Sequence, residues 1–306
     1  MQPQFPIYIP SKGRAKIRLT ADYLDYCKVP YKIVIEPQQY QMYLSYVKDK
    51  KKLLVMDLSY KEKYETCDMY GTPRSTGAGA ARNFIWEHSI SEGYAWHWTM
   101  DDNIKSFHRF NKNERVKVTN GGIFRAMEDF CLRYENVAMA GPNYKWFVPD
   151  RWIRDPYLAN TRIYSCNLIR NDVPFRWRGR YNEDTILSLD MLTAGWCTIQ
   201  FNAFLQDKVA TQSMDGGNTT ELYHGGKKTS TDGKYSDTGT IEKSNMLVRL
   251  YPNIAKVVKK YGRTHHHVDY KIFKKTKLIR KKNYTNVPID TEYGMKLHTK
   301  VDNEKK

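Results

Sequence analysis

Two stretches decide the fold: Gly77-Ala-Gly-Ala-Ala-Arg-Asn83 and Ala95-Trp-His-Trp-Thr-Met-Asp-Asp-Asn103. The first has the small residues of a helix start, where free N–H groups favour a negatively charged ligand, and Arg82 adds a fixed cation. The apolar and aromatic run 94–100 predicts a buried strand, so Asp101, Asp102 and Asn103 fall at its C-terminal edge. Open α/β sheets bind ligands at that edge, and hard oxygen ligands suit Mg²⁺ or Mn²⁺. The two stretches therefore predict a site for a phosphorylated ligand and a divalent cation.

The alternative is that Asp-Asp-Asn is a polar turn closing a strand, which is common for an isolated Asp-Asp pair. Further segments favour a binding site. Residues 6–14 read as a short strand that runs into a basic loop containing glycine, and 31–37 and 52–57 predict two more strands, with one helix over 38–47 between them. Strands that alternate with helices at this spacing predict a mostly parallel sheet with crossovers.

The order of four motifs resembles a known class of enzymes. These motifs are Ile9-Pro-Ser-Lys-Gly-Arg14, then Gly77 to Asn83, then the strand that ends in Asp101-Asp-Asn103, then Asn182-Glu-Asp-Thr185. Over residues 5–226 the chain resembles nucleotide-sugar-dependent glycosyltransferases of the GT-A fold. Within that class it looks closest to the phage TET/JBP-associated glycosyltransferases, and this resemblance implies action on hydroxymethylated pyrimidines in DNA. The chain departs from the usual pattern at Asn103, where the acidic motif carries a second carboxylate.

The resemblance implies a fold, a donor and a set of site residues. The expected fold is α/β, with a GT-A-like (Rossmann-like), mostly parallel sheet flanked by helices. The expected donor is a UDP-sugar, most plausibly UDP-glucose, held with Mg²⁺ or Mn²⁺. Donor-binding residues would be Pro10, Ser11, Lys12, Arg14, Gly79, Arg82, Asn83, Asp101 and Asp102. Metal ligands would be Asp101, Asn103 and His224, the last in the glycine-rich segment 222–228, which together with 214–218 is typical of mobile lids. A lone loop histidine is more often simply solvated.

The acid pair Glu183-Asp184 precedes a predicted amphipathic helix, Ile186 to Ala194, which Gly195 closes. A helix N-terminus keeps a carboxylate ionised, and an ionised carboxylate that faces the sugar can take the proton of an attacking hydroxyl. The alternative is a capping acid, which is common at helix starts. The resemblance favours catalysis, with Asp184 ahead of Glu183 as the base.

The formal net charge is +17, which points to a polyanionic partner such as nucleic acid. Residues 249–282 contain twelve Lys or Arg and a single Asp, interleaved with aromatic residues. Such a segment suits DNA, with Lys274, Lys275, Lys281 and Lys282 on phosphates. The alternative is a solvated helix whose apolar stripe, Ile254, Val257, Val258 and Tyr261, packs on the main domain; both can hold at once. We expect a glycosyltransferase domain over 1–235, a basic helical extension packed on it over 236–284, and a flexible tail over 285–306.

The segment 143–157 is rich in Trp, Tyr, Phe and Arg and lacks periodicity. Its Trp146, Arg151, Trp152 and Arg154 form a candidate surface for bases and phosphates. The alternative, aromatics that cover a sheet edge, is equally consistent with the pattern. Upstream, 116–134 predicts an amphipathic helix with Ile123, Phe124 and Met127 in the core, followed by strands over 137–142 and 161–169.

The remaining features bound the cellular setting. Five cysteines without metal-ligand spacing fit a reducing cytoplasm, here that of an infected bacterial host. We expect no membrane span and no signal peptide. Two other functions stay open at this stage: a soluble GT-A glycosyltransferase that modifies a glycan or protein, and a non-catalytic DNA-binding protein on a GT-A-like scaffold. The oligomeric state does not follow from the sequence.

Overall fold

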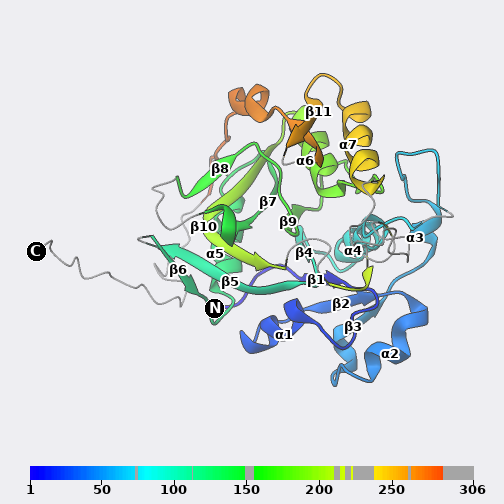
Figure 1. The fold of residues 1–306 in the computed structure, drawn as a ribbon. Helices are drawn as coiled ribbons and strands as arrows, with labels where there is room; N and C mark the ends of the chain where they lie inside the picture. Colours follow the sequence, from blue (N-terminus) through cyan, green and yellow to red (C-terminus); the bar gives the residue numbers. More distant parts are fainter. Residues whose placement is uncertain are drawn as a thin grey trace, which may run out of the picture.

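The computed structural model describes residues 1–72, 75–111, 113–148, 155–209, 214–217, 222, 238–260 and 263–284. Its centre is a mixed sheet flanked by helices (Figure 1), with strand order β3-β2-β1-β4-β9-β7-β10-β5-β6 and β8 paired to β10. In chain order the strands are β1 (Ile7–Pro10), β2 (Lys32–Ile35), β3 (Leu53–Val55), β4 (Trp96–Met100), β5 (Ile104–Asn111), β6 (Glu114–Lys117), β7 (Val137–Tyr144), β8 (Tyr157–Ala159), β9 (Cys166–Arg170) and β10 (Cys197–Lys208). The predicted α/β class is confirmed.

The half of the sheet formed by β3, β2, β1 and β4 is parallel throughout. The strand β4 is buried at all five positions, as expected for a strand covered on both faces. Antiparallel β9 then separates β4 from β7, and β10 runs parallel to β7. The strands β1, β2, β4, β7 and β10 therefore all end at the same edge of the sheet, and this edge gathers residues that are far apart in the sequence.

Helices cover both faces of the sheet. Their bounds are α1 (Leu19–Tyr26), α2 (Tyr40–Leu44), α3 (Ser59–Glu62), α4 (Gly79–Ser91), α5 (Gly122–Leu132), α6 (Glu183–Thr193) and α7 (Thr238–Leu250), with 3₁₀ helices η1 (Pro37–Gln39), η2 (Lys50–Lys52), η3 (Lys145–Phe147) and η5 (Tyr270–Lys275). Apolar side chains of α1 and α5, such as Leu24 and Phe124, share one core with the sheet. On the other face, Trp86 of α4 and Leu187 of α6 share a second core. The helix expected over 116–134 is shorter than predicted, because its first residues belong to β6.

The C-terminal extension corrects one prediction. The helix α7 is present, but the expected helix over Ile254 to Tyr261 is wrong, because residues there form β11 (Ala255–Lys260), which pairs with β12 (Arg263–Val268). Neighbouring β-branched residues such as Val257 and Val258 favour a strand, and the next segment supplies an antiparallel partner. The apolar spacing of residues 254–261 covers so short a run that it fits a helical and a strand period equally well. For this reason it wrongly predicted a helix. Tyr261 lies outside the described residues.

The extension packs on α6, as Figure 1 shows. A third core joins Ile186 and Leu189 of α6 to Leu247 of α7 and Phe273 of η5. The hydroxyl of Tyr251 also donates to the carboxylate of Asp190 on α6 over 2.6 Å. The extension therefore fixes the position of α6 from the outside.

Residues 276–282, which we call the clasp, return to the main domain. The backbone N–H of Lys281 donates to the carbonyl of Arg133 at 2.9 Å, and the N–H of Glu135 donates to the carbonyl of Ile279 at 2.8 Å. The clasp thereby ties the extension to the end of α5.

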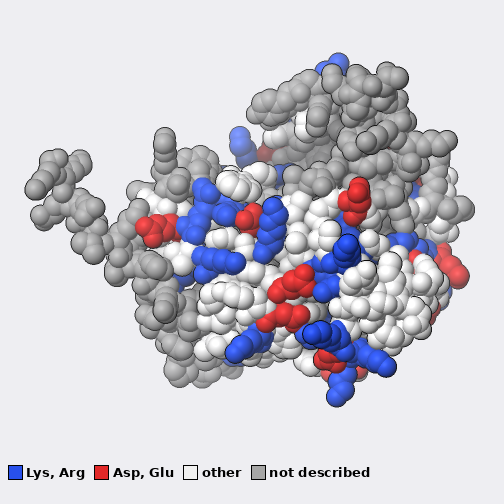
Figure 2. Space-filling model, turned by 60° about the horizontal axis from the view of Figure 1, so that its bottom comes forward, with Lys and Arg blue, Asp and Glu red and all other residues white. Residues whose placement is uncertain are grey.

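The basic surplus is not confined to the extension. Figure 2, which brings the bottom of Figure 1 forward, shows Lys and Arg side chains in several groups on a face away from α7 and β11, with Asp and Glu between them. All five cysteines are free. Among the described residues, no helix has the length and apolar character needed to cross a membrane.

Candidate active site

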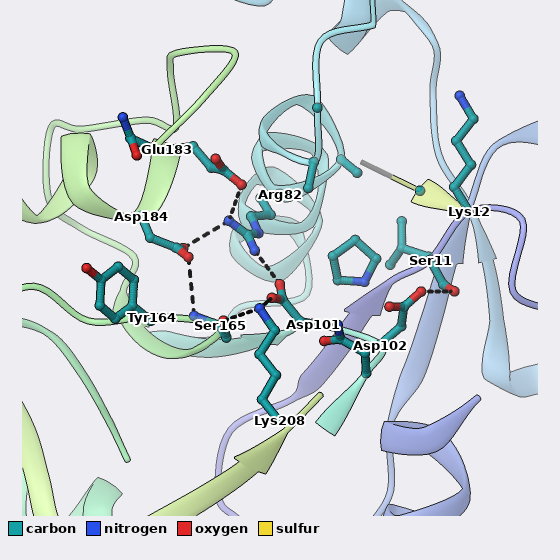
Figure 3. Close-up of a pocket in the computed structure, with 18 of the residues that line it drawn as sticks. Ser11, Lys12, Arg82, Asp101, Asp102, Tyr164, Ser165, Glu183, Asp184 and Lys208 are labelled. Carbon is teal, nitrogen blue, oxygen red and sulfur yellow. Dashed lines mark hydrogen bonds and ion pairs between the residues drawn. The ribbon is translucent and has the colours of Figure 1, made fainter. Parts of the chain in front are cut away.

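A cavity of about 380 Å³ opens at the edge where β1, β2, β4 and β10 end. Figure 3 shows its two ends: Ser11 and Lys12 lie on one side, Glu183, Asp184 and Tyr164 on the other, and Arg82 and Asp101 between them. Parallel strands deliver polar residues to this edge, which is where open α/β sheets bind ligands.

At the first end, Ser11 and Arg14 hold the carboxylate of Asp102. The hydroxyl of Ser11 donates to Oδ2 of Asp102 over 2.7 Å, and a guanidinium nitrogen of Arg14 lies 2.5 Å from Oδ1. Burial raises the pKa of Asp102, and these two partners oppose that rise. Arg14 also donates to the carbonyls of Asp215 at 2.9 Å and Gly216 at 3.0 Å. The described part of the glycine-rich segment is thus anchored beside the loop that follows β1.

Glu36, directly after β2, supplies a second carboxylate at this end. Lys61 lies 2.9 Å and Lys12 3.2 Å from its Oε1. Burial alone would raise the pKa of Glu36, but its two lysine partners lower it below its usual value. The group is therefore an ionised acceptor beside two cations.

In the middle, Arg82 joins acids from two distant parts of the chain. This side chain is only 2% exposed and its guanidinium lies 4.6 Å over the ring of Trp177. It contacts Oδ1 of Asp101 at 2.6 Å, Oε1 of Glu183 at 3.2 Å and Oδ1 of Asp184 at 2.9 Å. A buried guanidinium needs such partners, so Arg82 and the three acids form one unit.

Lys208, the last residue of β10, binds the other oxygen of Asp101. Its Nζ lies 2.7 Å from Oδ2 of Asp101 and 2.8 Å from Oγ of Ser165. Burial alone would raise the pKa of Asp101, but Lys208 and Arg82 overcome it and hold that pKa well below its usual value. Asp101 is therefore ionised and bound at both oxygens.

The acid pair lies at the start of α6. Asn182 adopts a left-handed conformation (φ 58°) just before the helix, and this turn brings Glu183 and Asp184 to the cavity. The backbone N–H of Ser165 lies 3.3 Å from Oδ2 of Asp184. Burial raises the pKa of both acids, and Arg82 counteracts that rise. A carboxylate with a raised pKa is a better proton acceptor than an ordinary aspartate.

The second end of the cavity is aromatic. The rings of Tyr144 and Tyr164 are stacked, 5.7 Å apart at an angle of 14°, and Phe147 meets Tyr144 edge-on at 5.3 Å. The guanidinium of Arg162 lies 4.4 Å over the ring of Tyr164. All four residues line the cavity. This end places a cluster of aromatic rings beside Asp184.

The extension contributes His266 of β12 and Lys243 of α7 to the lining. Burial lowers the pKa of His266, and together with the nearby charges of Lys243 and Arg162 it brings that pKa to about 4. The imidazole is therefore neutral at pH 7. His265, His266 and His267 follow one another on β12, where successive side chains point to opposite faces, and His266 is the one that lines the cavity.

Most predicted donor and catalytic residues line the cavity, and two do not. The lining includes Pro10, Ser11, Lys12, Arg14, Arg82, Asp101, Asp102, Asn103, Glu183 and Asp184. Gly79 instead packs against Tyr64, whose hydroxyl would lie 1.8 Å from an added Cβ. The side chain of Asn83 makes two 2.8 Å hydrogen bonds with the backbone of Trp177. Both residues shape the start of α4 rather than face the cavity.

The predicted DNA-binding residues are dispersed. Trp146 is 67% exposed and follows Tyr144 at the mouth of the cavity. Lys274, Lys275 and Lys282 are exposed and Lys281 is partly exposed, and none of the four lines the cavity. Arg151, Trp152, Arg154 and His224 lie outside the described residues, as do Lys227 and Lys228.

The described residues do not fit the predicted divalent cation. Both oxygens of Asp101 and both oxygens of Asp102 already accept from Arg82, Lys208, Arg14 or Ser11. In the part of the chain that the structure describes, no three side chains of His, Cys, Asp or Glu are grouped to hold a metal. The buried side-chain oxygen of Asn103 accepts no hydrogen bond from a described residue, so it is open to a cation. It is a single uncharged oxygen, however, and supplies no negative charge to the ion. Mg²⁺ and Mn²⁺ sites are built on carboxylates that are open to the ion.

The sequence analysis missed Lys208, Tyr164 and His266. A signal existed for Lys208, because residues 197–208 read as a strand with a charged residue at its end, and Asp101 likewise follows β4 directly. No local signal marks His266, whose place depends on how the hairpin docks on α6.

A family model for the TET-Associated Glycosyltransferase matches residues 5–217. This match spans β1 to β10 and includes every residue of the Asp101, Arg82, Asp184 and Lys208 cluster. Comparison with curated proteins and with solved structures finds no match.

Proposed function

We propose a specific reaction for this chain, which belongs to the TET-associated glycosyltransferase family. In this reaction a hexose, glucose from UDP-glucose, moves to the hydroxymethyl group of a 5-hydroxymethylpyrimidine in phage DNA inside the infected bacterial cell. The observation that carries the proposal is the cavity with a polar end and an aromatic end, which meet at Arg82, Asp101 and Asp184.

The polar end suits the nucleotide of the donor. Backbone and side-chain groups at Ser11 and Lys12, together with the ionised Glu36, offer donors and acceptors to a nucleoside. The start of α4 lies between this end and Asp101, and the free N–H groups of a helix start favour a diphosphate. The donor would thus lie along the ends of β1, β2 and β4, with its sugar near Asp184.

The aromatic end suits a pyrimidine. The stacked pair Tyr144 and Tyr164 lines the cavity next to Asp184, and proteins hold unstacked bases against aromatic side chains. A base inside a duplex cannot enter a cavity, so it would have to rotate out of the helix or be presented in a single strand. Arg162 and His266 border this end and supply hydrogen-bonding groups for the edge of the base.

The DNA strand would approach over an aromatic ledge, formed by Trp146 and Phe147 of η3. Both side chains are more than half exposed, at 67% and 56%. Arg115 and Lys145 lie 5.7 Å and 5.2 Å from the ring of Trp146. Exposed rings flanked by cations are typical of surfaces that stack bases and bind phosphates. Phe147 also lines the cavity, so the ledge leads into the aromatic end.

In the proposed chemistry, the hydroxymethyl oxygen attacks the anomeric carbon of the donor sugar. Asp184 accepts the hydroxyl proton, and the bond between the anomeric carbon and the diphosphate oxygen breaks with both electrons left on the diphosphate. Arg82 orients Asp184 and places positive charge near the leaving group. A single displacement assisted by a base inverts the anomeric centre, which linkage analysis of the product can read out.

The test is incubation of the protein with DNA that contains 5-hydroxymethyluracil or 5-hydroxymethylcytosine and with a panel of nucleotide sugars. Mass spectrometry of the digested nucleosides should show one hexose added to the modified pyrimidine with UDP-glucose. Unmodified DNA is the control. Transfer to glycans or proteins, with none to modified DNA, would contradict the proposed acceptor, and transfer only from another nucleotide sugar would contradict the proposed donor.

A further inference from the structure

The carboxylate of Asp101 could bind a cation, but the side chains of Arg82 and Lys208 already occupy its two oxygens. Asp101 Oδ1 binds Arg82 at 2.6 Å and Oδ2 binds Lys208 at 2.7 Å. An incoming divalent ion would have to displace one of these two cations from Asp101. The site therefore resists the ion that the family resemblance suggests.

The cavity also has the charge that a diphosphate requires. Among the described residues that line it, seven are Lys or Arg (Lys12, Arg14, Lys61, Arg82, Arg162, Lys208 and Lys243) and five are Asp or Glu (Glu36, Asp101, Asp102, Glu183 and Asp184). The surplus of two positive charges matches the two negative charges of a diphosphate diester. No added metal is needed for this balance.

Arg82 and Lys208 are suited to different tasks. Arg82 is fixed by three acids and by Trp177, so it supplies charge without moving. Lys208 ends β10 at a register irregularity between Asp207 and Lys208. Within the described part of the chain its side chain, 13% exposed, is held through Nζ by Asp101 and Ser165. A lysine ammonium on a flexible stem can follow a phosphate, and burial strengthens the attraction because water screens it less.

We propose that Lys208, backed by Arg82, replaces the divalent cation: it binds the diphosphate of the donor and stabilises it as a leaving group, so that donor binding and transfer are independent of metal. The inference rests on the proposed nucleotide-sugar donor. During transfer the anomeric carbon–oxygen bond breaks, both electrons remain on the diphosphate oxygen, and the ammonium of Lys208 neutralises the added charge. The new bond forms between the acceptor hydroxyl oxygen and the anomeric carbon, and the hydroxyl proton goes to Asp184, so no co-reactant beyond the acceptor is required.

The test is calorimetric titration of the full chain with UDP, in chelator and in Mg²⁺ or Mn²⁺. We expect the same Kd in all three conditions. Lys208→Met should weaken UDP binding by about tenfold or more, as loss of a charge-assisted hydrogen bond predicts. Lys208→Arg should retain much of the affinity. Lys52→Met is the matched control, because Lys52 also forms an ion pair with an aspartate, Asp25, but lies outside the cavity.

Metal independence, the role of Lys208 and the proposed donor are each contradicted by a different result. UDP binding that appears only with added metal overturns metal independence, and UDP binding that Lys208→Met leaves unchanged overturns the role of Lys208. If Lys208→Met does not fold, the chelator comparison on the wild type and the Lys208→Arg variant still decide. Failure to bind UDP in every condition contradicts the proposed donor itself and overturns this inference with it. Failure of the DNA assay with intact metal-free UDP binding contradicts only the proposed acceptor.

Discussion

Arg82 lies 2.9 Å from Asp184, and this ion pair links the helix that begins at the donor end of the cavity to the helix that presents the proposed base. The same guanidinium reaches Asp101 at 2.6 Å. Asp101 at the end of β4 and Asp184 at the start of α6 therefore share one guanidinium. The first two predictions concern this pair.

Asp184→Asn should lower kcat by about 10²- to 10⁴-fold, because the amide keeps the size of the carboxylate but cannot accept the proton. UDP affinity measured by calorimetry should stay near that of the wild type. Asp172→Asn, at an exposed carboxylate paired with Arg170, is the control and should keep full turnover. Loss of donor binding together with turnover would make Asp184 a structural residue of α6.

The pH profile should report the environment of Asp184. Burial raises its pKa, so the carboxylate is protonated and inactive as a base at pH values where an ordinary aspartate, with a pKa of about 3.9, is already ionised. Activity should rise with pH through a limb above that value. Arg82→Met removes the group that lowers the pKa of Asp184 and should move the limb to higher pH. Measurement of kcat from about pH 4 to about pH 8 checks both statements. A variant with an unmoved limb would show that Asp184 does not control it.

Trp146→Ala should weaken DNA binding by about 1–3 kcal/mol, the usual contribution of one stacked base, and leave UDP binding unchanged. Tyr26→Ala is the matched control, because Tyr26 is 58% exposed and also lies under a cation, Lys117, but belongs to α1 and not to the aromatic ledge. Fluorescence anisotropy of labelled single-stranded DNA measures the effect. Equal losses in the two variants would argue against the aromatic ledge.

The basic extension gives a separate prediction. If Lys274, Lys275, Lys281 and Lys282 contact phosphates, replacing all four with Gln should flatten the dependence of log affinity on log salt by about 0.9 per lost contact on duplex DNA. Replacement of Lys48, Lys50 and Lys51, exposed lysines near η2, should change the slope less. Hydrolysis of the donor should be unaffected. An unaltered slope would mean that the extension is a solvated surface, and the aromatic ledge would remain as the acceptor surface.

The raised pKa of the buried Glu128 should make the free energy of unfolding depend on pH. It is fully buried on α5 and accepts hydrogen bonds from Trp98 Nε1 at 2.8 Å and from the N–H of Gln4 at 2.7 Å. Burial raises its pKa to about 7, whereas an unfolded glutamate has a pKa of about 4.3. Between these values the folded state binds more protons, so the Glu128 contribution to the free energy of unfolding falls as pH rises towards 7.

Glu128→Gln removes this titration. The variant should lose about 1–3 kcal/mol, because its NH₂ group faces one of the N–H donors, and it should show a flatter dependence of stability on pH than the wild type below pH 7. Urea unfolding at several pH values measures both effects. Identical slopes for the two proteins would show that Glu128 is ionised throughout the range.

The end of β4 and the start of α6 could be predicted because each is marked by a pattern of neighbouring residues in the sequence. Trp96 to Met100 is an apolar run that meets two carboxylates, and Glu183 begins an amphipathic helix. The ion pairs of Arg82 could not be predicted from the sequence. Glu183 and Asp184 lie about a hundred residues after Arg82 and reach it only because β4, β9 and α6 pack together. Lys208 and His266 depend in the same way on the register of β10 and on the docking of the hairpin. In the extension, the β-branched residues Val257 and Val258 belong to a strand where the apolar spacing predicted a helix.

The extension also has a consequence for synthesis. The apolar side of α6 is covered by Leu247 and Phe273, and the clasp then ties the extension to Arg133. A nascent chain that has emerged as far as Gly217 contains the described residues of the donor end of the cavity, while α6 still exposes Ile186 and Leu189. The proposed base is thus secured only when the last part of the extension has left the ribosome, and until then the bare side of α6 is a natural target for chaperones.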